Sequence, residues 1–224
     1  MTIRTHVFDA GGHFGRALPT IRRTLAAAVD HVSQVSALDN VDMVVQPVDF
    51  GTDQYPIAAF TSGPHNIHIG IERSQLRSED LEDELYRSTI HELHHALRWR
   101  HLTKPWTVGE MVTLEGLALL ADHAAAGPQD EVDRPLSDPD RALADLAAIR
   151  CDPLSRHRAW LYSSEDAQPG GVGRVYALGA LLMSAALARL SLDPWTAADR
   201  PARDLLDHGY AALADDQTQR KRPA

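Results

Sequence analysis

The N-terminal third of the chain combines one long stretch of helical spacing with several short apolar runs. Apolar side chains recur every three or four positions over residues 18–38, which predicts an amphipathic helix. Short apolar or alternating runs predict strands at residues 4–9, 40–50, 57–61 and 65–72. In the last run Ile67, Ile69 and Ile71 fall on one face, so this strand is expected to be half-buried. Together these segments predict a small sheet packed on helices.

A glycine cluster follows the first predicted strand, in the sequence Gly11-Gly12-His13-Phe14-Gly15. It lacks the lysine and the serine or threonine of a phosphate-binding loop. The cluster is therefore predicted to be a turn.

Helical spacing governs the rest of the chain. One helix is predicted to begin at Ser78 or Asp80 and to end near residue 102, with a core stripe of Leu81, Leu85, Ile90, Leu93 and Leu97. Pro105 stops this helix, and Thr107 and Glu110 have the capping-box spacing that begins the next one. Further helices are predicted at residues 141–151, 175–190 and 201–214, with a polar loop at residues 163–173.

These elements place the chain in the α+β class, with a small N-terminal sheet packed on helices and a mainly helical C-terminal half. Residues 127–140 are polar and acidic, contain three prolines, and are interpreted as a linker. The predicted division is an N-terminal part at residues 1–126, the linker at 127–140, and a C-terminal helical part at 141–224. The two parts are expected to form the walls of one cleft within one compact unit.

Composition narrows the class of partner. The net charge of −9 disfavours nucleic acid and anionic membrane surfaces. No secretory signal is evident, and the longest apolar stretch, residues 175–190, is short of the roughly 20 residues that span a bilayer. The single cysteine, Cys151, is interpreted as a buried or incidental thiol rather than a nucleophile. A chain with one cysteine cannot form an intrachain disulfide, which is compatible with a reducing cytoplasm. We therefore expect a cytoplasmic protein.

The candidate chemistry lies in the sequence His91-Glu92-Leu93-His94-His95, within a predicted helix. Residues four apart lie on one helix face, one turn apart, so the imidazoles of His91 and His95 can bind a single ion. Glu92 lies beside this pair, where its carboxylate can take a proton from a metal-bound water. Zinc is the ion that such a pair favours. The sequence therefore predicts one catalytic zinc ion per chain, with Glu92 as the general base.

A third ligand is required, and two glutamates follow at suitable distances. Glu110 already has a role in the predicted capping box, whereas Glu115 falls in an apolar stripe where an uncompensated carboxylate is costly. In an antiparallel pair of helices, at about 1.5 Å per residue, Glu115 would also return near the level of His95. Glu115 is therefore the predicted third ligand.

Other arrangements of the same residues stay open. His94 could pair with His91 at a spacing of three, although Glu92 would then lie between the ligands. Asp122 could orient a ligand histidine or could be an ordinary helix-surface residue. The two motif histidines are expected roughly opposite the core stripe of their helix, which suits an open metal site and also suits two solvated histidines.

The motif and its surroundings resemble a known family. The sequence HELHHALRWR, followed by Leu114-Glu115-Gly116-Leu117-Ala118 in the next helix, is similar to the bacterial predicted zinc-dependent proteases that carry HExHH and EGLA motifs. A more distant resemblance is to the gluzincin metallopeptidases, both thermolysin-like and membrane-alanyl-aminopeptidase-like. The specific resemblance covers about residues 88–122. It implies zinc on His91, His95 and Glu115, with Glu92 as base.

Two further expectations follow from the resemblance. An extended peptide would pair with the edge strand that precedes the motif helix, which we expect to be residues 65–72. The segment around Tyr176 is similar to a family segment with an aromatic residue at a helix start, so Tyr176 is the first candidate to stabilise the oxyanion. His157, Tyr162 and Arg174 are alternatives, and Tyr176 could equally be an ordinary core or boundary residue.

The residues and the resemblance together predict a zinc-dependent metallopeptidase acting on a peptide or protein substrate. A zinc hydrolase of a non-peptide amide or ester would need the same residues. A third reading is a non-catalytic interaction protein in which zinc only joins two helices, although such a protein has no need of Glu92.

Overall fold

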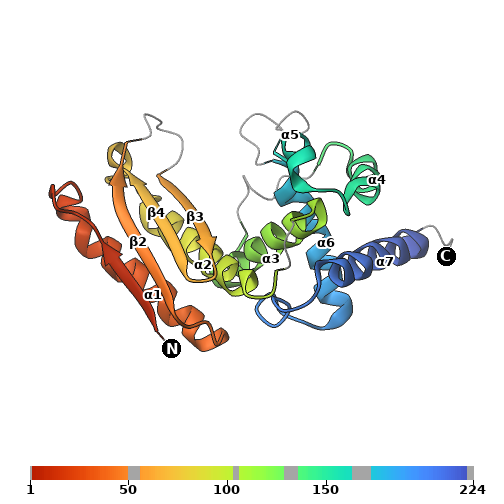
Figure 1. Ribbon diagram of the computed structural model, residues 1–224, viewed down its shortest axis with the longest axis horizontal. Helices are drawn as coiled ribbons and strands as arrows, with labels where there is room; N and C mark the ends of the chain where they lie inside the picture. Colours follow the sequence, from red (N-terminus) through yellow and green to blue (C-terminus); the bar gives the residue numbers. More distant parts are fainter. Residues whose placement is uncertain (1, 50–55, 103–105, 129–135, 163–172, 221–224) are drawn as a thin grey trace. The chain divides into compact units, whose positions relative to one another are not determined.

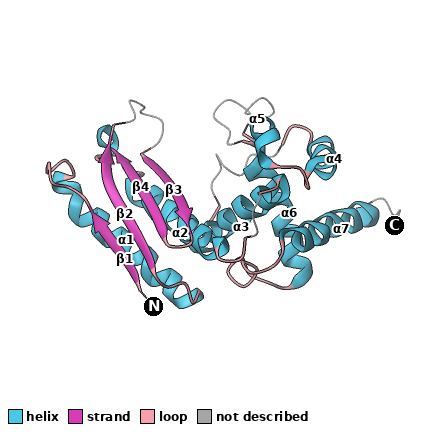
Figure 2. Ribbon diagram, viewed as in Figure 1, coloured by secondary structure: helices cyan, strands magenta, loops and turns pink. Residues whose placement is uncertain are grey.

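The computed structural model describes residues 2–49, 56–102, 106–128, 136–162 and 173–220 (Figures 1 and 2). The chain forms two compact units, Met1–Arg100 and His101–Ala224. The first contains the sheet and two long helices, and the second is helical, so the α+β class is confirmed. Residues 129–135 of the predicted linker at 127–140 lie outside the described residues, and its last two residues begin a helix, Pro139–Ile149. The division predicted around the linker stays a prediction.

The first unit is built on a four-stranded sheet of mixed direction. Its strands are β1 (Ile3–Val7), β2 (Val41–Val48), β3 (Ile57–Gly63) and β4 (Asn66–Glu72), which confirms all four predicted strands. Their order is β1-β2-β4-β3, in which β1, β2 and β4 are parallel and β3 is antiparallel to β4. The expectation that residues 65–72 form the edge strand is wrong, because β4 pairs with β2 on one side and with β3 on the other. The edge strand next to β4 is β3.

Two helices cover one face of this sheet, as Figure 2 shows. They are α1 (Leu18–Val35) and α2 (Leu81–Trp99), which pack against each other, and α2 also packs on β3 and β4. Alternate residues of β2 and β4 point to the helices and are fully buried, among them Val41, Met43, Val45, Ile67 and Ile69. The period-two pattern in the sequence therefore gives the core of the first unit. Short 3-10 helices, η1 (Gly15–Ala17) and η2 (Arg73–Gln75), precede α1 and α2 respectively.

The second unit begins with the predicted capping box. The Thr107 backbone N–H donates to Glu110 Oε2 at 2.8 Å, and the Glu110 N–H donates to Thr107 Oγ1 at 3.2 Å. This cap starts α3 (Val108–Ala126), which is followed by α4 (Pro139–Ile149), η3 (Leu154–Arg156), α5 (Arg158–Leu161), α6 (Arg174–Leu190) and α7 (Ala202–Arg220). The short α5 was not predicted, and α7 continues past the predicted end. The predicted loop at 163–173 lies outside the described residues except for its last position.

Helix α3 is buried on nearly every side, because α6 and α7 pack against it within the second unit. Its closest approach to α6 is at two glycines. A Cβ atom on Gly116 would lie 2.5 Å from the backbone of Gly179, and one on Gly179 would lie 2.7 Å from the Gly116 Cα. Small residues at this crossing allow the two backbones to touch. Among the described residues, no helix is both long enough and apolar enough to cross a bilayer.

The Gly116–Gly179 contact yields the first prediction. Gly179→Ala places a methyl group against the Gly116 backbone, which has no room to move aside. Overpacking a core costs about 1–3 kcal/mol, and this variant should be destabilised by at least that amount. Thermal or urea unfolding measures the change. Gly63→Ala is the control, because a Cβ there meets nothing within 4 Å. Equal stability of the two variants would contradict the close backbone contact.

Candidate metal centre

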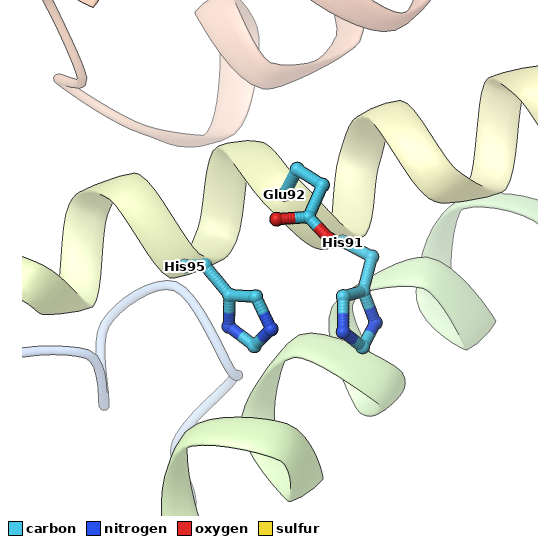
Figure 3. Close-up of side chains that lie close together, drawn as sticks. All are labelled: His91, Glu92 and His95. Atoms are coloured by element: carbon cyan, nitrogen blue, oxygen red, sulfur yellow. The ribbon is translucent and has the colours of Figure 1, made fainter. Parts of the chain in front are cut away.

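Helix α2 brings His91, Glu92 and His95 together. One ligand atom from each of the three side chains lies within 4.8 Å of the others. The two imidazole rings project from the same side of α2, with centroids 4.4 Å apart and planes at 82° (Figure 3). This is the expected result of a four-residue spacing on a continuous helix. The first three predicted site residues are thus neighbours in space as well as in sequence.

The site is more enclosed than the sequence suggested. Leu81, Leu85, Ile90 and Leu93 are buried as predicted, but Leu97 is only half-buried. His95 and Glu92 are each only 6% exposed, and His94 is fully buried. His91 keeps an intermediate exposure. The reading of two fully solvated histidines opposite a single core stripe is therefore wrong.

A residue that the sequence did not identify contacts Glu92. The hydroxyl of Thr61, on the edge strand β3, lies 2.7 Å from Glu92 Oε2 and 3.0 Å from the Glu92 backbone oxygen. An O–H donor at this distance from a carboxylate makes a short, charge-assisted hydrogen bond. Thr61 is 31 positions away in the sequence, and a threonine in a strand pattern carries no signal of such a role. Only the packing of α2 on β3 reveals it.

Thr61 is also the one side chain of the described residues that hydrogen-bonds the Glu92 carboxylate. A carboxylate that is almost fully buried is expensive to desolvate unless it is paired or bound. Ordinary stability does not require this charge at this position. The arrangement leaves Oε1 of Glu92 available to another group, while Oε2 is anchored.

The other predicted site residues belong to the second unit. Glu115 lies on α3, is 8% exposed, and is flanked along the helix by the apolar residues that the sequence predicted: Met111, Val112, Ala118 and Leu119. Glu110 is occupied by the helix cap, as expected. Asp122 is 4% exposed and is therefore no helix-surface residue. The assignment of Glu115 as a ligand together with His91 and His95 stays a prediction.

The candidates for oxyanion stabilisation lie near the start of α6 and before it. Tyr176 is partly buried and packs against the hydrophobic cluster of the second unit. His157 is 2.9 Å from the Asp152 carboxylate, and Arg174 stacks over the Trp160 ring and donates to its backbone oxygen at 3.2 Å. Each of these three therefore has a local structural role.

Tyr162 has a different electrostatic setting. Burial raises the pKa of its hydroxyl above the ordinary value, and the negative charge of Glu115 raises that pKa further. Cys151, in contrast, is exposed, so it is not a buried thiol. That it is an incidental thiol stays a prediction.

A comparison with known families identifies the family of this chain. Residues 21–207 match the family described as "Predicted Zn-dependent protease (DUF2268)", and the chain belongs to that family. No curated protein and no solved structure matches the chain. The family description supports a zinc-dependent protease. It does not say which residues bind zinc or how the reaction proceeds.

Proposed function

We propose that this protein is a zinc-dependent metallopeptidase that hydrolyses peptide bonds with Glu92 as general base. The observation that carries the proposal is the cluster of His91, Glu92 and His95 on one turn of α2. Two imidazoles on one helix face, with a buried carboxylate beside them, are the donor set that catalytic zinc uses. Membership in a family of predicted zinc-dependent proteases supports the same chemistry.

In this proposal His91, His95 and Glu115 hold one zinc ion per chain. Glu115 is preferred to Glu110 because the carboxylate of Glu110 is committed to the helix cap, while Glu115 is buried in an apolar helix. Three protein ligands leave the fourth position open, as catalysis requires. The further likeness to gluzincins rests on this ligand set.

Each protein group then has a defined task. Zinc held by these residues would supply a Lewis acid and would lower the pKa of its bound water to about 7. The Oε1 atom of Glu92 takes the proton from the attacking water and delivers it to the nitrogen of the leaving amine. Thr61 anchors Oε2, so that the carboxylate faces the water without swinging away.

The proposal also includes the strand that binds the peptide and the residue that stabilises the oxyanion. An extended peptide would add to the sheet at β3, the edge strand that packs against α2. Tyr176 is the proposed oxyanion donor by resemblance, with His157, Tyr162 and Arg174 as the alternatives. We also propose that the protein is cytoplasmic.

The first test concerns the ligands. The purified protein should contain close to one zinc ion per chain, and His91→Ala, His95→Ala and Glu115→Ala should each sharply lower zinc affinity. Glu110→Ala is the matched control, since it should cost only the about 1 kcal/mol of a helix cap. Metal analysis and competition with a chromogenic chelator measure the affinity. Zinc loss in Glu110→Ala but not in Glu115→Ala would overturn the ligand assignment.

The second test separates an enzyme from a zinc-joined binding protein. Glu92→Gln should keep the zinc content and the melting temperature, because Glu92 moves protons and does not hold the metal. Loss of the base should nevertheless reduce turnover about 10²-fold or more. A quenched-peptide library at equal zinc loading measures turnover. If neither protein cleaves any peptide, the assignment shifts to a non-peptide hydrolase or a non-catalytic zinc protein.

The third test concerns Thr61 as a positioning residue. Thr61→Val keeps the shape of the side chain but removes the hydroxyl, so Glu92 loses its anchor and kcat should fall about tenfold to 10²-fold. KM and zinc content should not change, and Thr61→Ser should restore kcat because it keeps the donor. Ser62→Ala, the exposed neighbour on β3, is the control. A kcat of Thr61→Val equal to that of the wild type would remove the positioning role while leaving the proposed function intact.

A further inference from the structure

A second candidate site lies at the opposite end of the same sheet. Two loops of the first unit enclose a cavity of ≈ 1000 Å³, one between β1 and α1 and the other between β4 and α2. Its charged lining consists of Arg16, Arg73 and Arg77, with His13 and Ser74 as further hydrogen-bonding groups. Among the described residues, no acidic side chain lines it. The proposed chemistry at His91, Glu92 and His95 uses none of these residues.

The charges of the three arginines are not neutralised by ion pairs within the described part of the chain. Eight other arginines of the described chain form ion pairs with Asp or Glu. Within the same described residues, no carboxylate lies at ion-pair distance from Arg16, Arg73 or Arg77. Three positive charges thus converge on one hollow of a chain whose net charge is −9. This local field opposes that of the whole protein and favours an anion.

The backbone of the first loop is fixed before any ligand arrives. Phe14 is 1% exposed and anchors the loop in the core, and its N–H donates to the Asp9 carboxylate at 3.2 Å. Gly12 has a φ of 64°, which favours glycine. The Asp9 carboxylate is therefore directed to the loop backbone. The turn predicted at residues 11–15 is confirmed, and it holds His13 and Arg16 at the rim of the cavity.

The second loop is held in a similar way. Glu72 is 2% exposed, and one of its oxygens accepts from the backbone N–H of Ser74 at 3.3 Å and from the Ser74 hydroxyl at 3.4 Å. The Leu76 N–H donates to the Arg73 carbonyl and closes the 3-10 turn. Arg73 and Arg77 therefore extend from a fixed turn, and the Glu72 carboxylate, next to Arg73 in the sequence, is directed to that turn.

The position in the sheet suits a small ligand. Both loops leave the carboxyl ends of parallel strands, and β2 separates these two strands. Strands two places apart are separated by about 10 Å, which is the span of a small phosphorylated molecule. Ligands of parallel α/β sheets bind beyond the carboxyl ends of the strands.

We propose that the cavity lined by Arg16, Arg73 and Arg77 binds a small phosphate-bearing anion. Guanidinium groups match a phosphate with paired N–H donors, and three of them can neutralise its two negative charges. The site goes beyond the proposed peptidase activity, because it shares no residue with the metal centre. Its ligand would be an effector of the protein and not a substrate of the zinc chemistry.

The test is a titration of the full-length protein with inorganic phosphate at constant ionic strength, followed by backbone amide NMR. We expect saturable shifts confined to residues 11–17 and 72–78, with a dissociation constant below about 1 mM. The variant carrying Arg16→Gln, Arg73→Gln and Arg77→Gln should bind at least tenfold more weakly. Arg156→Gln, an exposed arginine of the second unit, is the control and should bind as the wild type does.

Three results of the phosphate titration would overturn the proposal. These are no saturation by phosphate, equal affinity of the triple variant, and shifts that lie at residues 91–95 in place of the two loops. A tetraglutamate peptide is titrated in parallel. Tighter binding of that peptide than of phosphate would assign the cavity to acidic protein segments and would likewise overturn the phosphate assignment.

Discussion

The unbroken turn of helix from His91 to His95 is the constraint on which the candidate metal centre depends. Two imidazoles can share one ion only if the backbone between them keeps helical spacing. The spacing is secured by the packing of α2, whose residues Leu85, Ile90 and Leu93 are buried against the rest of the first unit. The apolar packing of α2 therefore also sets the geometry of the site. It fixes the orientation of the helix, and with it the directions in which His91, Glu92 and His95 project.

The features that the sequence predicted well are those encoded over a few neighbouring residues. The histidine spacing, the capping box at Thr107 and Glu110, and the period-two strands all depend on local chain geometry. The bounds of most long helices could be predicted for the same reason, although α7 continues past its predicted end. Local patterns also identified Glu115 as an unusual carboxylate, because its helical neighbours are apolar.

The features that the sequence missed depend on pairing between distant segments. The order of strands decides which of them is the edge, and the apolar alternation of β4 has the same form at an edge and in the interior. Thr61 contacts Glu92 only because β3 lies beside α2. The arginine-lined cavity lies between two loops that are far apart in the sequence, because most of the strands come between them. Its glycine cluster, taken alone, resembles any other turn.

The metal centre and the arginine-lined cavity are joined by two rigid elements of the first unit. In β4, the residue that pairs with Thr61 is Ile67, and the strand ends at Glu72, where the arginine loop begins. Helix α2 starts at Leu81, just after Arg77, and reaches His91 after about 15 Å at 1.5 Å per residue. A ligand that drew Arg73 and Arg77 together would act on the ends of the strand and of the helix that position Glu92. Because β3, β4 and α2 pack against one another, the arginine loop and Glu92 are attached to the same packed framework of the first unit.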